Sequence, residues 1–216
     1  MTSIEDRLRL IVEVSTRKAA IKEWNDAAAS QKVPLYNYRL DHIEEVVELA
    51  KHIAEGTNAN MEVVVLAAWL HDLAKPGIGG ISAEQHGIAS AKMAEEILTA
   101  EKVQHDTIEK VSEVIRKHVG LTLKEPLEPI EAQIIWEADK ILKLGVIGEF
   151  QGLLNGVRLF PGRNMKQIAE DQREFLTLAR KIVDSVVTEN GKAIAHERVR
   201  TLELISESLD REMHLK

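Results

Sequence analysis

The sequence predicts an all-α protein, and three observations support this fold class. Apolar residues recur three or four positions apart over most of the chain, the spacing that places them on one face of a helix. Helix-capping residues and Pro or Gly breakers divide these stretches into separate elements. No strand signal, an alternation of apolar and polar residues with a period of two, stands out.

Capping residues indicate where several of the helices begin. The expected helices span about 2–30, 41–56, 61–74, 82–98, 106–120, 130–144, 165–189 and 193–213. Thr2 with Glu5 and Asp106 with Glu109 form capping-box patterns for the first and fifth of them. Asn60 is a suitable N-cap for the strongly apolar third helix, because its side-chain oxygen can accept from the first free backbone N–H groups.

Breakers indicate where the helices end. Pro34 stops the first, because the residue before a proline is driven away from helical backbone angles. Gly56 is a good left-handed cap for the second. Pro76-Gly77 ends the third, Pro129 opens the sixth, and Phe160-Pro161-Gly162 separates the last two helices from the rest.

Composition excludes several classes of protein. A chain of 216 residues with 44% hydrophobic and 29% charged residues fits a single globular domain, 1–216, and no apolar run reaches the roughly 18 residues that a membrane span needs. No secretory signal is evident at the N-terminus, and there is no cysteine, so we expect a cytoplasmic protein without disulfides or thiolate ligands. The net charge of −7 argues against nucleic acid as a partner.

Five polar side chains lie on helix faces that are otherwise apolar. They are His42, His71, Asp72, His118 and Asp139. Burying one such group without a partner costs on the order of 2–7 kcal/mol, so five on core-facing positions need a shared partner. A divalent cation supplies one, and imidazole with carboxylate suits Mn, Fe, Co, Ni or Zn. Ligands that project inward from several helices are a common way to build such a site.

These residues make the sequence similar to a known family, the HD-domain metal-dependent phosphohydrolases, whose pattern is a His, a His-Asp pair and a distant Asp. The matching segments are His42 with Val46 and Ala50, His71-Asp72-Leu73-Ala74-Lys75, and Glu137-Ala138-Asp139-Lys140. The resemblance covers about 38–160 and leaves the flanking helices 2–30 and 165–213 unassigned. It implies a helical bundle in which His42, His71, Asp72 and Asp139 bind metal.

The resemblance extends to a subset of the family that adds histidines for a second metal. His86, in His86-Gly87-Ile88-Ala89, and His118, in Ile115-Arg116-Lys117-His118, fall at those positions. With two ions, Asp72 is the expected bridge, since a carboxylate has two oxygens to share and an imidazole offers one metallating nitrogen. Asp139 would then complete the first site, and His86 and His118 would hold the second.

The expected chemistry is hydrolysis of a small phosphorylated compound, a nucleotide being the expected class, at a phosphomonoester or phosphodiester bond. A divalent ion lowers the pKa of a coordinated water and polarises a phosphoryl oxygen, so no protein nucleophile is needed. We assign Asp72 and Lys75 as catalytic, because the Lys75 ammonium lies one turn beyond the pair and can meet a phosphate oxygen or protonate a leaving group. A helix C-terminal lysine that complements the dipole is an equally good explanation of Lys75.

Two other functions remain open. The six-ligand set also resembles that of the mixed-valent di-iron oxygenases of the same superfamily. A non-catalytic sensing or interaction module that keeps a metal for stability is the third alternative, and chelation would then unfold the protein without turnover ever being seen. Self-association into a homo-oligomer is open as well.

A glycine series follows the sixth helix, with Gly145, Gly148, Gly152 and Gly156 on one helical face. Close helix packing is the favoured explanation. The functional alternative is that this bare face floors the substrate pocket, with the guanidinium of Arg158 or Arg163 binding phosphate oxygens at its mouth.

The remaining charged side chains have ordinary explanations. We expect His52, His105, His196 and His214 to be solvated or capping residues, because none belongs to a ligand pattern. Lys140 is expected to be solvated, and Arg39 to be a surface arginine at the start of a helix.

Overall fold

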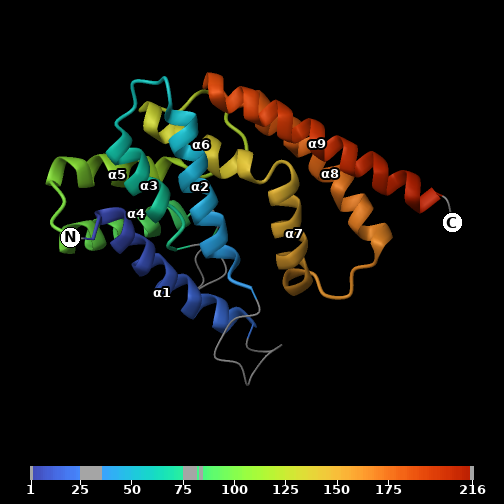
Figure 1. The fold of residues 1–216 in the computed structure, drawn as a ribbon, viewed down its shortest axis with the longest axis horizontal. Helices are drawn as coiled ribbons and strands as arrows, with labels where there is room; N and C mark the ends of the chain where they lie inside the picture. The colour runs from blue at the N-terminus through green and yellow to red at the C-terminus, as the bar shows by residue number, and fades with distance from the viewer. Residues whose placement is uncertain (1, 25–35, 75–81, 83–84, 215–216) are drawn as a thin grey trace.

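The computed structural model describes residues 2–24, 36–74, 82 and 85–214. This part of the chain is helical and contains no strand, so the predicted all-α fold class is confirmed (Figure 1). Its helices are α1 (Ile4–Trp24), α2 (Tyr38–Ala54), α3 (Met61–Leu70), α4 (His86–Ala100), α5 (His105–Lys117), α6 (Ile130–Leu142), α7 (Val146–Leu159), α8 (Met165–Asp184) and α9 (Glu189–His214).

The central helix is α6, and five other helices pack around it. Every residue from Ala132 to Leu142 is buried, including four polar ones, which requires neighbours on all sides of the helix. Helices α2, α3, α5, α8 and α9 all contact α6, and α4 packs on α5 at the far side (Figure 1). One hydrophobic cluster extends from Leu8 on α1 to Leu202 on α9.

The last two helices form an antiparallel pair that extends away from the ligand-bearing helices, with α7 between this pair and α2 (Figure 1). Buried Glu137 on α6 anchors the pair. Its carboxylate accepts hydrogen bonds from the backbone N–H groups of Val187 and Thr188, at 2.7 and 3.1 Å, and from the Thr188 hydroxyl. Gln133 Nε2 donates a further bond of 2.8 Å to the same carboxylate.

The structure confirms some of the expected helix starts and corrects others. Asn60 caps α3, accepting from Glu62 N and Val63 N as predicted. The capping pattern assigned to Thr2 and Glu5 is wrong by one residue, because the reciprocal bonds join Ser3 and Asp6. The second predicted capping box, Asp106 with Glu109, is absent, since α5 already begins at His105 after Gln104.

Several helix boundaries also differ from the expected ones. The first helix ends at Trp24 within the described residues, and positions 25–30 of its expected range lie outside them. Helix α2 begins three residues before Asp41, and α4 begins at His86, four residues after Ser82. Helix α3 ends at Leu70, so that His71 and Asp72 lie in the turn that follows. Helix α8 ends at Asp184, five residues early, because the chain turns there to make the Glu137 contacts.

Candidate metal centre

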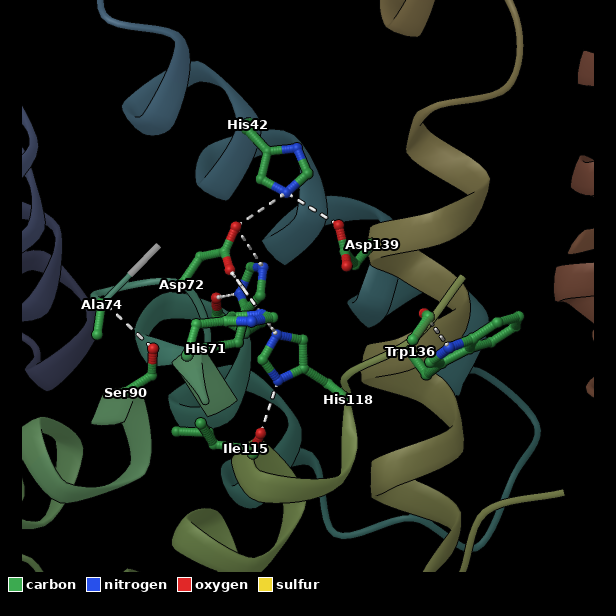
Figure 2. Close-up of polar contacts among 12 residues, drawn as sticks. His42, His71, Asp72, Ala74, Ser90, Ile115, His118, Trp136 and Asp139 are labelled. Carbon is green, nitrogen blue, oxygen red and sulfur yellow. Dashed lines mark hydrogen bonds and ion pairs between the residues drawn. The ribbon is translucent and has the colours of Figure 1, made fainter. Parts of the chain in front are cut away.

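All six predicted ligands converge on one buried site. Figure 2 labels five of them, His42, His71, Asp72, His118 and Asp139. His42 comes from α2, His71 and Asp72 from the turn after α3, His86 from the first residue of α4, His118 from the residue after α5, and Asp139 from α6. None of the six is more than 9% exposed. The surrounding helices therefore hold the site away from bulk water.

Asp72 lies at the centre of two groups of potential ligands. The donor atoms of His42, His71 and Asp72 all lie within 4.8 Å of one another, and those of Asp72, His86 and His118 do the same. The two carboxylate oxygens divide between these groups. Oδ2 lies 3.7 Å from His42 Nε2 and 3.8 Å from His71 Nε2, whereas Oδ1 lies 3.7 Å from the Nε2 atoms of His86 and His118.

Two of the imidazoles are oriented by backbone carbonyls (Figure 2). His71 Nδ1 lies 2.8 Å from the carbonyl of Ala68, and His118 Nδ1 lies 2.6 Å from that of Ile115. Because a carbonyl can only accept, each Nδ1 carries the proton, and each Nε2 has a lone pair in the neutral ring. This second hydrogen bond is how metal-binding histidines commonly fix their tautomer and ring direction.

His71 shows most directly that the site fits a cation. Its Nε2 is buried and has no hydrogen-bond partner among the described residues. Burial lowers the pKa of His71 to about 4, so the ring is neutral near pH 7 and keeps its lone pair. An unsatisfied buried polar atom costs about 1–3 kcal/mol, and a metal ion is a partner that such a lone pair can accept.

Asp139 joins the first group through His42, whose Nε2 lies 3.0 Å from Asp139 Oδ1. The ammonium groups of Lys140 and Lys143 contact the same carboxylate, and Lys143 Nζ also donates to the Asp139 carbonyl at 2.9 Å. Burial alone would raise the pKa of Asp139, but the two lysines hold it well below its ordinary value. The carboxylate is therefore ionised, as a metal ligand must be.

Comparison with known proteins agrees with this geometry. The family model described as HD domain matches residues 39–144, which include all six of these side chains. This chain belongs to the HD-domain family. The segment that matches the family model ends two residues after α6, so α7, α8 and α9 lie outside that segment.

Among proteins similar to this chain, ribonuclease Y from Cutibacterium acnes is 28% identical over 159 residues, covering 66% of this chain and 29% of that protein. The chain spans less than half the length of the curated relatives it matches. The structure of Bacillus subtilis YpgQ in complex with ADP superposes with a TM-score of 0.68 at 19% identity, covering 96% of this chain and 97% of that one. An HD-superfamily hydrolase from Bacillus thuringiensis superposes with a TM-score of 0.60 at 19% identity, covering 97% of this chain and 100% of that one. At these identities the solved structures show a shared fold.

Two charged residues next to the HD-domain site differ from the sequence prediction. Lys140, expected to be solvated, is 5% exposed, because its ammonium pairs with buried Asp139. Arg39, expected at the surface, is 6% exposed, and its guanidinium lies 2.6 Å from Glu23 Oε1 near the end of α1. The four histidines without a ligand pattern are exposed, as expected.

Sequence reasoning did not assign a role to two residues that contact the ligands. The Tyr38 ring stacks on His42, with ring centroids 5.6 Å apart and planes inclined by 18°. Lys143 lies four residues after Asp139, on the same face of α6, and this spacing is a signal that could have identified it. Lys75 lies outside the described residues, so its assignment as catalytic stays a prediction.

A cavity of about 590 Å³ lies beside this site, between α7 and α8, with Tyr38 and Lys143 in its lining. Arg163 also lines it, and its guanidinium pairs with Asp171 and lies 4.1 Å above the Phe160 ring centroid. Arg158 is directed elsewhere, with Nη2 3.1 Å from Asn155 Oδ1 and 3.8 Å from Glu23 Oε2.

Two glycines of the series, Gly152 and Gly156, do not serve the close packing that we favoured from the sequence. A Cβ added at Gly152 or Gly156 would find no atom within 4 Å, and both residues line the cavity. Gly148 is sterically required, because a Cβ there would meet the Lys143 carbonyl. Gly145 is required as well, because its φ is +88° and a Cβ there would lie 3.1 Å from the Arg198 side chain on α9. Gly145 precedes α7 as its N-cap.

Proposed function

We propose that this HD-domain protein is a metal-dependent phosphohydrolase that cleaves a phosphomonoester or phosphodiester bond in a nucleotide. The observation that carries the proposal is the division of the Asp72 carboxylate, one oxygen facing His42 and His71 and the other facing His86 and His118. Membership of the HD-domain family supports hydrolysis as the general reaction.

In this proposal one ion is held by His42, His71, Asp72 and Asp139, and a second by Asp72, His86 and His118. A divalent ion bound there supplies a water of lowered pKa as nucleophile and polarises the phosphoryl oxygen. The carbonyls of Ala68 and Ile115 keep the Nε2 atoms of two of these histidines free of protons. Because water is the nucleophile in this proposal, the role of the ligand side chains is to bind and orient.

Cations around the site would bind the phosphate. Lys143 is placed for this, since its ammonium contacts Asp139 and its side chain lines the adjoining cavity. Arg163, on the same cavity wall, is a second phosphate contact in the proposal, and Lys75 is a third that could protonate the leaving group. Arg158 was predicted for the same role, but its pairing with Asn155 and Glu23 makes it the weaker choice.

Two comparisons support a nucleotide as the substrate class. The YpgQ structure contains ADP, and the first curated relative carries the name of a ribonuclease. Both observations belong to those proteins, and they enter here only as support for the choice of substrates to test.

The test combines metal analysis with a substrate screen. Protein purified in metal-supplemented medium is analysed by mass spectrometry for bound Mn, Fe, Co, Ni and Zn. It is then assayed for phosphate release from nucleotides, phosphomonoesters and phosphodiesters with each ion. Asp72→Ala should remove both ions and all activity, His118→Ala should keep about one ion per chain, and His52→Ala, which alters an exposed histidine, should match the wild type.

Each alternative has its own signature in the same experiment. Equal metal loss in Asp72→Ala and His118→Ala refutes the division into two sites, and wild-type protein without metal refutes the proposal. Bound iron with visible absorption and oxygen consumption would indicate a di-iron oxygenase. Retained metal that stabilises the fold without turnover on any substrate would indicate a non-catalytic module.

A further inference from the structure

The cavity between α7 and α8 is formed mostly by residues outside the 39–144 match, so family membership does not explain it. Its volume of about 590 Å³ lies in the range of roughly 300–1,000 Å³ that is typical of small-molecule sites. Tyr38 and Lys143 are shared with the metal centre, where they contact His42 and Asp139 respectively. A molecule with its phosphate at the metal centre could therefore extend into this cavity.

One wall of the cavity is the bare face of α7. Gly152 and Gly156 leave open space where a side chain would stand. Their lack of a Cβ has a cost, because glycine inside a helix destabilises it by about 0.5–1 kcal/mol relative to alanine. Among the described residues no atom lies within 4 Å of a Cβ built at either position, so tight packing does not account for them.

The cavity also contains a buried polar group whose hydrogen bonding is incomplete. Gln172 on α8 is only 7% exposed, and its Nε2 forms no hydrogen bond of normal geometry within the described part of the chain. Glu149 on α7 lines the same cavity, where burial raises the pKa of its carboxyl and an interaction with the Gln172 side chain offsets part of that rise. The amide and the carboxyl together offer hydrogen-bond donors and acceptors inside an otherwise apolar space.

Resting on the function proposed above, we infer that this cavity holds the base of the nucleotide. A heterocyclic ring suits walls that include Phe160 and Phe175, because aromatic side chains attract flat π-systems. Its edge heteroatoms would pair with the Gln172 amide, as glutamine pairs with the edge of adenine in other complexes. An alkyl chain would leave the Gln172 amide without a hydrogen bond of normal geometry. A bare sugar would leave the apolar walls uncovered.

The test is a binding measurement with non-hydrolysable probes. Calorimetry of the metal-loaded protein compares the 5′-methylenediphosphonates of adenosine, guanosine, cytidine and uridine with methylenediphosphonate, which has the same phosphorus groups and no base. We expect at least one nucleoside compound to bind tenfold or more tightly than methylenediphosphonate. Gly152→Leu and Gly156→Leu, which fill the open space, should abolish that preference and leave binding of methylenediphosphonate unchanged.

Matched variants show whether a lost preference for the nucleoside compounds is due to a filled cavity or to a general effect of substitution in α7. Leu154→Ala, on the same helix but outside this cavity, should keep the full preference. The Gly→Leu variants should melt no lower than the wild type, because leucine favours the helix and nothing lies within 4 Å of the new Cβ. Gln172→Leu should reduce the preference among the four bases.

The outcomes separate this inference from the proposed hydrolase activity. If the Gly→Leu variants bind the nucleoside compounds as the wild type does, or lose methylenediphosphonate equally, the cavity is not the base site. Absence of any preference in the wild type also overturns the inference. Base-dependent binding that the Gly→Leu variants abolish, in a protein that hydrolyses no phosphate ester, would uphold the inference and refute the proposed activity.

Discussion

The metal-free protein should lose stability as the pH falls from 7.5 to 5, and His71 should account for the loss. Burial lowers the pKa of this imidazole from 6.5 to about 4, whereas in the unfolded chain it returns to the ordinary value. Between these two values the unfolded state binds a proton that the folded state does not. Stability due to neutral His71 is therefore complete above pH 6.5 and is lost as the pH falls toward 4.

The size of the effect follows from the same shift. Each pKa unit is worth about 1.36 kcal/mol, so the full shift corresponds to about 3 kcal/mol, of which about 2 kcal/mol should be lost by pH 5. Asp139 does not contribute to the change in stability between pH 7.5 and 5. Its pKa is lowered in the fold, so its contribution is present above the unfolded value of 3.8 and disappears only below it.

Urea unfolding of chelator-treated protein at pH 7.5, 6.5, 5.5 and 5.0 measures the loss. His71→Gln removes the titrating ring, and comparing each protein with itself across pH cancels the constant cost of the lost bond to Ala68. The variant should lose about 2 kcal/mol less than the wild type between pH 7.5 and 5.0. Equal losses in the two proteins would show that His71 is not held neutral by burial.

Three further predictions concern stability and can be read from the same unfolding midpoints. Gly191→Ala should cost about 1–3 kcal/mol, because the new Cβ would collide with buried Glu137; an unchanged midpoint would contradict the packing described. Arg39→Ala should cost about 1–3 kcal/mol, because the part-buried Glu23 carboxylate would lose its 2.6 Å contact and keep the longer one, 3.8 Å, with Arg158; a double variant with Glu23→Gln should recover part of the loss. Asn60→Ala should cost about 1 kcal/mol through loss of the α3 cap, with no change in metal content at saturating metal.

The ligands could be predicted from sequence because of the energetic cost of their placement. His42, Asp72 and Asp139 are polar groups at positions where helical spacing demands apolar ones, and the structure does bury them. Since this argument needs only the spacing within each helix, it works without knowing how the helices pack. It does not reveal how ligands from different helices divide between two ions, which here required the distances around Asp72.

The failures of prediction concern partners and surroundings that the spacing within one helix does not reveal. Arg39 looked like a surface residue because Glu23 belongs to another helix. The ion pair with Glu23 compensates for the loss of water around the buried guanidinium. Lys140 looked solvated because the spacing rule says nothing about an ammonium that turns back to its own neighbour, Asp139. Gly148, Gly152 and Gly156 share one face of α7, but helical spacing does not say whether such a face meets another helix or open space.

In the proposed function, the position of the cavity separates chemistry from selectivity. The side chains that would hold metal come from α2 to α6 and fall within the HD-domain match, whereas most of the cavity wall comes from α7 and α8, beyond it. The two parts meet at Tyr38 and Lys143. A change in α7 could therefore alter which molecule is bound without disturbing a single metal donor. The family accordingly predicts the reaction class, and the identity of the substrate must be sought in residues 146–175.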